Sequence, residues 1–248
     1  MPNVFPGPFK GNERNDFVNF SHQPIAVAKG SLAIPAITIN TSNAWYVDGK
    51  YFEQYNGTTS TAVMPTMGTI ANNGLNIDTI TGAAAKSIEI TQGISAAQLN
   101  AFVAGTSPAF FVRATFNINT IANVDDLNVG FRVNSAYSAT PDTYSDYANF
   151  GVEGASLLLQ SQTNLASAGV VLTSSGVSMV AGQNFTVQVS VSSAGVASYS
   201  YALNNGPMLA ATTAAYTFGA VTVVPYIIYS TVTSHTEVDL VSYACGLL

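Results

Sequence analysis

The chain has 248 residues, of which 8% are charged, 48% are hydrophobic and one is a cysteine. A folded chain of this length buries roughly 70–75% of the surface that its unfolded form exposes, so its core needs no disulfide or metal for support. The lone Cys245 excludes an intrachain disulfide and a cysteine-based zinc or iron–sulfur site. We therefore expect one large domain with an extended arm.

Charged residues are unevenly distributed along the chain. No Asp, Glu, Lys or Arg lies between Glu153 and Glu237, and no Lys or Arg follows Arg132. Because clusters of Lys and Arg bind phosphate backbones, we expect no nucleic-acid partner. The N-terminus lacks the basic and apolar parts of an export signal, and the apolar stretch 218–229 is too short for a membrane helix. We expect no membrane partner.

Residues 1–30 are predicted to form an extended arm. Prolines exclude regular helix there, and exposed phenylalanines are costly unless they dock on something. The arm either packs on its own domain or contacts a neighbouring molecule, and the sequence leaves both open. The residues concerned are Pro2, Pro6, Pro8 and Pro24, with Phe5, Phe9, Phe17 and Phe20 between them.

Residues 31–85 are predicted to form a β-hairpin followed by loops. Asp48-Gly49 separates strands expected at 44–47 and 50–54, and Asp-Gly is a strong two-residue hairpin signal. The hairpin's aromatic side chains either form its packed face, stack on a sugar or contact another subunit. They are Trp45, Tyr46, Tyr51, Phe52 and Tyr55.

Residues 86–248 are predicted to be almost entirely β, apart from one short helix. Ser95 can cap a helix that ends near Val103, before Gly105. Strands are expected at 87–91, 110–117, 127–133, 148–152, 156–160, 169–172, 184–191, 196–203, 221–229 and 237–243. We expect turns at Glu153-Gly154 and at 204–206, where Gly206 would supply the left-handed conformation. Strands at this spacing predict a sandwich or barrel.

The order of several strand motifs resembles a known family. These motifs are Phe-Phe-Val-Arg-Ala-Thr-Phe (110–116), Val-Gly-Phe-Arg (129–132), Tyr-Ala-Asn-Phe-Gly-Val-Glu-Gly (147–154), Val-Pro-Tyr-Ile-Ile-Tyr (224–229) and Val-Asp-Leu-Val-Ser-Tyr (238–243). Over about residues 87–246 they resemble the concanavalin A-like jelly roll, a two-sheet sandwich. The resemblance implies an all-β fold of the kind found in lectins, glucanases and tailed-phage surface proteins.

No catalytic motif accompanies this resemblance. The glucanases of the family place alternating carboxylates, Glu-x-Asp-x-(x)-Glu, on one strand face, and no such run occurs here. The nearest pair, Glu237 and Asp239, lacks the third acid, and we interpret it as a solvated outer face of the last strand. We expect a protein that is not an enzyme and has no catalytic residues.

A bound metal or cofactor is not expected either. Two loop groups carry oxygen ligands of the kind that calcium prefers, but neither has a recognisable calcium-loop spacing. They are Asp125, Asp126 and Asn128, and Asp142, Asp146 and Asn149. His22 and His235 have no cysteine or acid at metal-ligand spacing.

The arm, the low charge and the Ala/Ser/Thr/Asn-rich composition resemble the phage structural branch of the family most. This implies a capsid decoration (cement) protein on the virion surface, assembled in the host cytoplasm, with the major capsid protein and its own copies (a homo-dimer or homo-trimer) as partners. The expected contact residues are Phe5, Phe9, Phe17, Phe20, Trp45, Tyr46, Tyr51, Phe52 and Tyr55. The alternative is a carbohydrate-binding head- or tail-fibre module that recognises a host surface glycan.

Overall fold

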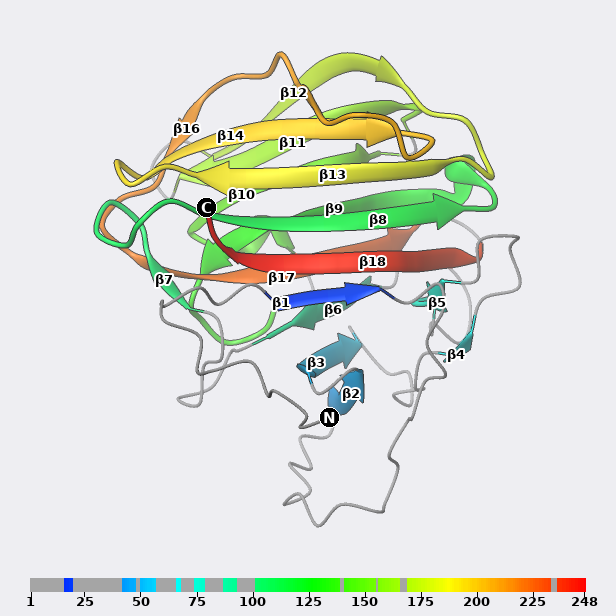
Figure 1. Cartoon of the computed structure of the whole chain (residues 1–248), viewed down its shortest axis with the longest axis horizontal. Helices are drawn as coiled ribbons and strands as arrows, with labels where there is room; N and C mark the ends of the chain where they lie inside the picture. Colours follow the sequence, from blue (N-terminus) through cyan, green and yellow to red (C-terminus); the bar gives the residue numbers. More distant parts are fainter. Residues whose placement is uncertain are drawn as a thin grey trace, which may run out of the picture.

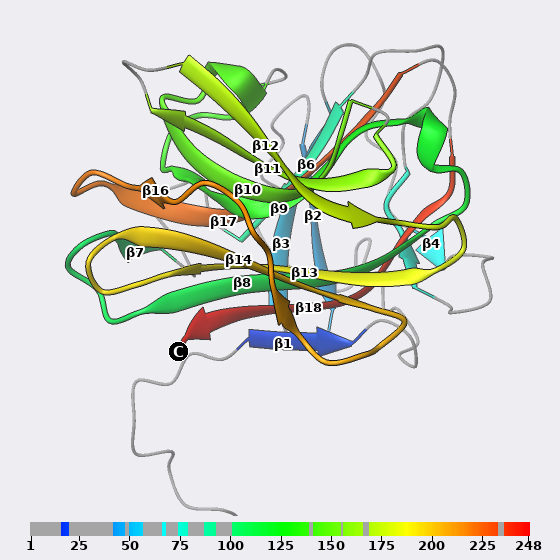
Figure 2. The ribbon, with the colours of Figure 1, turned by 90° about the horizontal axis from the view of Figure 1, so that it is seen from above.

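The computed structural model describes residues 16–19, 42–47, 50–56, 66–67, 74–78, 87–92, 101–138, 141–154, 156–165, 169–232 and 236–248. Within these residues the chain forms strands β1 to β18 and two short 3-10 segments, η1 (Ile121–Asn123) and η2 (Pro141–Thr143), and no α-helix. The strands lie in two antiparallel layers, as expected for a jelly-roll sandwich (Figures 1 and 2). No helix in the described part is long and apolar enough to cross a membrane.

The first sheet, sheet A, contains strands from both ends of the chain. Its central strand β8 (Phe110–Ile118) lies between β13 (Asn184–Val191) and β18 (Val238–Leu247). The order continues through β14 (Val196–Leu203) to β15 (Leu209–Ala210) on one side, and through β5 (Leu75–Asn76) to β4 (Thr66–Met67) on the other. β1 (Asp16–Asn19) pairs with β18, and β16 (Tyr216–Thr217) pairs with β14.

The second sheet, sheet B, is built around β9 (Val124–Val133), which lies between β10 (Asp146–Glu153) and β17 (Thr222–Thr231). Beyond β10 come β11 (Leu158–Leu165) and β12 (Gly169–Ser178). Beyond β17 come β6 (Ser87–Thr91), β3 (Lys50–Asn56) and β2 (Ser42–Val47). β7 (Phe102–Val103) also pairs with β17.

The core lies between the sheets and follows the two-residue period of the strands. Phe110, Val112, Ala114 and Phe116 of β8 are all fully buried, as their alternation predicts. Phe110 of sheet A stacks on Phe102 of sheet B with ring centroids 4.4 Å apart, and both rings meet Phe131 of β9 edge-on. Each large buried side chain of this kind contributes about 1.5–3 kcal/mol to folding.

The structure confirms the predicted hairpin and shows how the N-terminal segments join the sandwich. β2 and β3 pair with Val47 opposite Lys50, as the Asp-Gly turn predicts. The strands before residue 86 belong to the same two sheets as the strands that follow it, and β1, within the arm, lies along β18 (Figures 1 and 2).

Two local predictions are corrected. Phe102 and Val103, expected at the end of a helix, form β7, because Phe102 packs on Phe110 while their backbone pairs with β17. Residues 93–100 of that expected helix lie outside the described residues. At the turn after β14, Asn204 (φ 51°) and Asn205 (φ 58°) take the left-handed conformation that we assigned to Gly206.

Candidate functional site

The outer face of sheet B carries a continuous array of polar side chains, which we call the polar face. In β9, Leu127, Val129 and Phe131 point into the core, so the alternate residues point outward. Strand register places the outward residues of six neighbouring strands side by side. They include Glu53, Glu89, Tyr226, Ser230, Asp126, Asn128, Arg132, Tyr147, Asn149, Glu153, Gln160 and Gln162.

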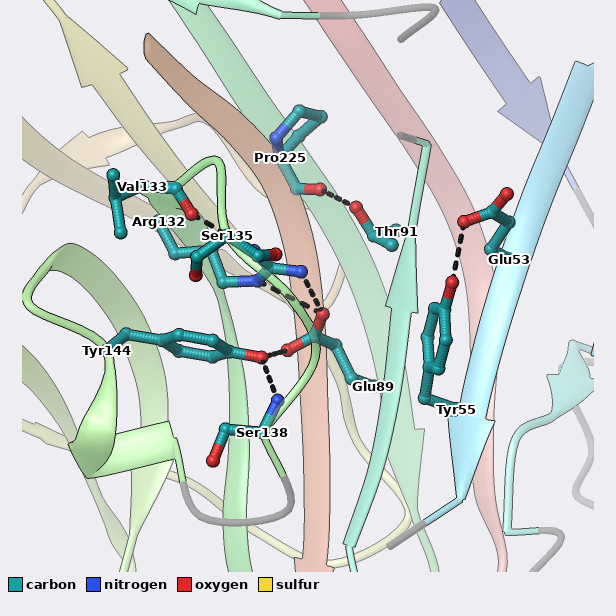
Figure 3. Close-up of polar contacts among 10 residues, drawn as sticks. All are labelled: Glu53, Tyr55, Glu89, Thr91, Arg132, Val133, Ser135, Ser138, Tyr144 and Pro225. Carbon is teal, nitrogen blue, oxygen red and sulfur yellow. Dashed lines mark hydrogen bonds and ion pairs between the residues drawn. The ribbon is translucent and has the colours of Figure 1, made fainter. Parts of the chain in front are cut away.

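One end of the polar face is organised by a buried ion pair (Figure 3). Arg132 of β9 donates from Nη2 and Nε to one oxygen of Glu89 in β6, at 2.6 and 3.1 Å, and neither side chain is exposed. Tyr144 donates to the other oxygen at 2.8 Å, and its ring lies under the Arg132 guanidinium. The remaining donor of Arg132, Nη1, binds the carbonyl oxygens of Val133 and Ser135.

This ion pair ties the connection between β9 and β10 to the sheet. Tyr144 follows η2, and its hydroxyl also accepts the backbone N–H of Ser138 (Figure 3). Burial raises the pKa of Tyr144, and the Glu89 carboxylate raises it further. Burial on its own lowers the pKa of Arg132, but Glu89 and Tyr144 outweigh it and raise that pKa above its usual value. Arg132 therefore stays charged, and its ion pair with Glu89 is a structural clamp.

Next to this clamp, hydrogen bonds between side chains of β17, β10 and β11 pass over Gly130 in the middle of β9. We call them the amide network. Asn149 and Tyr226 stand on either side of Gly130 in the strand register. The Asn149 amide donates to the Tyr226 hydroxyl and to Gln162 Oε1, both at 3.0 Å. A Cβ on Gly130 would lie 2.2 Å from the carbonyl oxygen of Ala148, so no larger residue fits there.

The opposite end of the polar face is acidic. Glu153 of β10 stands opposite Asp126 of β9, and its two oxygens accept from Asn128 at 2.9 Å and from Gln162 at 3.2 Å. Gln162 also donates to Asp142 at 2.9 Å. The Asn128 Oδ1 atom is buried here without a hydrogen-bond partner. Three carboxylates and two amides therefore converge on one small area.

Burial, together with the neighbouring carboxylates, holds a proton on Glu153 at this acidic end. Burial raises the pKa of Glu153 well above its ordinary value of 4.5, and the neighbouring Asp126 raises it further, while the Asn128 amide opposes the shift. Glu153 is thus a neutral carboxylic acid at neutral pH, able to donate as well as accept a hydrogen bond. Asp142 is exposed, and Asp126, Glu153 and Gln160 are half-buried, so this end can reach a ligand.

The predicted contact residues are only partly within the described region. Phe52 and Tyr55 of β3 are 1% and 3% exposed; Phe52 meets Tyr243 edge-on and Tyr55 stacks on Tyr137. These two side chains therefore pack within the chain itself. Phe17 lies in β1, and Trp45, Tyr46 and Tyr51 lie in the hairpin strands, where the structure describes only the backbone path. Phe5, Phe9 and Phe20 lie outside the described residues, so a contact role of this set stays a prediction.

The carboxylate pair of the last strand needs a correction. Asp239 is not solvated on an outer face but fully buried, while Glu237 is half-buried. The burial of Asp239 could not be predicted from the sequence. Strand alternation shows which residues of β18 point to its outer face, but it does not show whether other segments cover that face.

The loop groups considered for calcium are used in other ways. Asn128 and Asn149 both donate their amides within the polar face, to Glu153 and to Tyr226 and Gln162. In the part of the chain that the structure describes, no three His, Cys, Asp or Glu side chains are grouped to hold a metal ion.

The clamp residues Glu89 and Arg132 were not singled out from the sequence, although it contains a signal for them. Glu89 lies between Ile88 and Ile90, and Arg132 lies between Phe131 and Val133. A charge inside an apolar strand needs a partner when it is buried. Tertiary structure alone identifies that partner, 43 residues away.

Comparisons with known proteins support the fold. No family model matches the chain, and no curated protein matches its sequence. Among solved structures, the VIP36 exoplasmic/lumenal domain in its Ca2+/Man3GlcNAc-bound form is 7% identical with a TM-score of 0.52, covering 79% of this chain and 83% of that one. Its metal-free form has a TM-score of 0.50, 7% identity and coverages of 79% and 84%. Peanut lectin is 12% identical with a TM-score of 0.49, covering 79% and 97%.

The chain thus folds as a concanavalin A-like jelly-roll sandwich, the architecture that it shares with the VIP36 exoplasmic/lumenal domain. At these identities the likeness shows the fold alone. These neighbours give no support to the capsid decoration protein that we expected first.

Proposed function

We propose that this protein binds carbohydrate, and that the acidic end of the polar face is the binding site. The observation that carries the proposal is the convergence of Asp126, Asp142 and Glu153 with the amides of Asn128 and Gln162, at a half-exposed end of one sheet.

The chemistry of this group suits sugar hydroxyls. A hydroxyl both donates and accepts hydrogen bonds, and it is best bound by a rigid mixture of acceptors and donors. Asp142 supplies acceptors, and Gln160 supplies both an acceptor and donors. Gln162 of the amide network binds both Asp142 and Glu153 and holds them in place, which lowers the entropy lost on binding.

The fold gives secondary support. The VIP36 domain of similar fold has a structure with Ca2+ and Man3GlcNAc bound. Function follows the site rather than the fold, so this likeness only raises the expectation. A metal is not part of this proposal, because no three His, Cys, Asp or Glu side chains of the described residues are grouped to hold one. We therefore propose a site that binds its ligand with protein side chains.

The test is a glycan microarray probed with the full chain, followed by calorimetry with the best neutral glycan. Gln160→Ala removes a half-exposed amide of the polar face. Gln188→Ala removes a comparable half-buried amide from β13, which lies in the other sheet. We expect the first variant to weaken binding at least about tenfold, the effect of a lost hydrogen bond of about 1.4 kcal/mol, and the second to leave it unchanged.

Equal affinity of both variants would place any glycan site elsewhere, and absence of binding to every array member would reject carbohydrate binding. The aromatic hairpin is the alternative location. Trp45→Ala would abolish affinity if the hairpin were a stacking platform, and would not affect the glycan affinity of the polar face.

A further inference from the structure

A row of amide and carboxylate side chains crosses four strands of sheet A on its outer face. Strand register places Asn76 of β5 opposite Asp239 of β18, Asp239 opposite Asn117 of β8, and Asn117 opposite Asn184 of β13. Directly opposed residues of antiparallel strands have Cβ atoms about 4.5–5.5 Å apart, so their side chains are neighbours.

Three oxygen atoms in this row are buried without hydrogen-bond partners. They are both carboxylate oxygens of Asp239 and Oδ1 of Asn117, and neither residue is exposed. The Asn117 amide nitrogen donates to the Gly182 carbonyl at 2.9 Å and to Asn184 Oδ1 at 3.0 Å. These two hydrogen bonds of the nitrogen fix the orientation of the Asn117 side chain. Its Oδ1 atom remains available to a ligand.

Leaving a carboxylate in this position without a partner is costly. Burial, together with the nearby Glu237, raises the pKa of Asp239 from 3.8 to about 7. Gly74 closes the site from the β5 side, since a Cβ there would lie 2.8 Å from Asp239 Cβ. A bound proton could join Asp239 to Asn117 but would leave one carboxylate oxygen unpaired. A cation can be bound by all three oxygens at once.

We propose that Asp239 and Asn117 form a site for a divalent cation of the calcium type. Only oxygen donors are present, which selects a hard cation. Calcium accepts bidentate carboxylates and amide oxygens in flexible geometry, whereas magnesium requires a regular octahedron. Water completes the coordination. A single carboxylate gives weak binding, with a dissociation constant of about 10⁻⁴–10⁻³ M.

This site is independent of the proposed carbohydrate site, because it lies on sheet A and shares no residue with the polar face. It stabilises the pairing of β18 with β8. Because the ion binds only the folded chain, calcium should raise the melting temperature.

The test uses the full chain, stripped with EDTA and titrated with calcium chloride at about pH 8, where Asp239 is ionised. Calorimetry measures binding, and thermal unfolding measures Tm. Asp239→Asn keeps the shape of the side chain and removes its charge. Asp125→Asn is the matched control, because Asp125 is an exposed acid of sheet B.

We expect calcium to raise the Tm of the wild-type chain and of Asp125→Asn, and to have no such effect on Asp239→Asn. Without calcium, Asp239→Asn should melt no lower than wild type, since it removes a buried, unpaired charge. This separates loss of the ion from a failure to fold. An unchanged wild-type Tm at 10 times the expected dissociation constant, or an equal calcium response in Asp239→Asn, would overturn the proposal.

Discussion

Arg132 and Glu89 form an ion pair at 2.6 Å in which neither side chain has any exposed surface. The pair connects β9 to β6, which are not neighbours in sheet B, because β17 lies between them. With Tyr144 it joins the outer face of three strands to the connection that follows β9 (Figure 3). A charge taken out of water this completely depends on its partner for stability.

We predict that Arg132→Met lowers the free energy of unfolding by about 3–5 kcal/mol, because it leaves the Glu89 carboxylate buried and unpaired. Urea denaturation measures the loss. The double variant Arg132→Met with Glu89→Gln is the control, since it removes both charges and should recover part of the stability. A double variant no more stable than the single one would contradict the ion-pair explanation.

Gly130 should tolerate no side chain. Its added Cβ would lie 2.2 Å from a backbone oxygen, and Gly151 has a similar contact at 2.0 Å. Gly130→Ala should therefore destabilise the chain by at least about 1–3 kcal/mol, through displacement of β9 from β10. Gly219→Ala is the control, because nothing lies within 4 Å of its added Cβ. Similar unfolding midpoints for the two variants would show that β9 shifts without cost.

The raised pKa of Glu153 predicts that the free energy of unfolding depends on pH. Its pKa is higher in the folded chain than the ordinary value of 4.5, so the folded state holds the proton more tightly than the unfolded state. Its contribution is complete below about pH 4.5 and is lost as the pH rises from there to about 9, the pKa of Glu153 in the folded chain. Glu153→Gln stays neutral, so its stability should fall less between about pH 4.5 and pH 8. Urea midpoints at a series of pH values test this, and parallel curves for the two proteins would contradict it.

The turn at 203–206 offers a prediction about backbone strain. Asn204 and Asn205 both have positive φ, and the N–H of Gly206 donates to the Leu203 carbonyl at 2.9 Å. Asn205→Ala should cost about 1–2 kcal/mol, because a Cβ disfavours this conformation. Asn205→Gly should be neutral or slightly stabilising, since Asn-Gly suits such a turn. Thermal unfolding distinguishes them, and a more stable Ala variant would mean that the turn changes its type.

Much of the sandwich could be predicted from local pattern. β13 and β14 occur at the predicted bounds 184–191 and 196–203, because alternation of apolar and polar residues there is regular and turn residues border both strands. The short helix was not confirmed at Phe102, where packing against Phe110 and pairing with β17 determine the local conformation. Local propensity is weak compared with such tertiary contacts.

The candidate sites were less predictable than the fold. Asp126 was considered in one loop group of calcium ligands, and Asp142 and Asn149 in another, but the polar face to which they contribute depends on register between six strands. Asp239 was expected in solvent and is buried. The two-residue period of a strand predicts which side chains share a face. It predicts neither the register between strands nor whether other segments cover that face.

The sequence by itself determined the class of this protein: a strand-rich chain with few charges and one cysteine forms a two-sheet sandwich, since alternation defines one apolar face per strand. Only the tertiary structure decided which outward residues meet. Glu89 and Arg132, or Asn117 and Asp239, are 43 and 122 positions apart (132 − 89 and 239 − 117). Their proximity arises from the order of strands in each sheet, a long-range property that depends on packing the whole core.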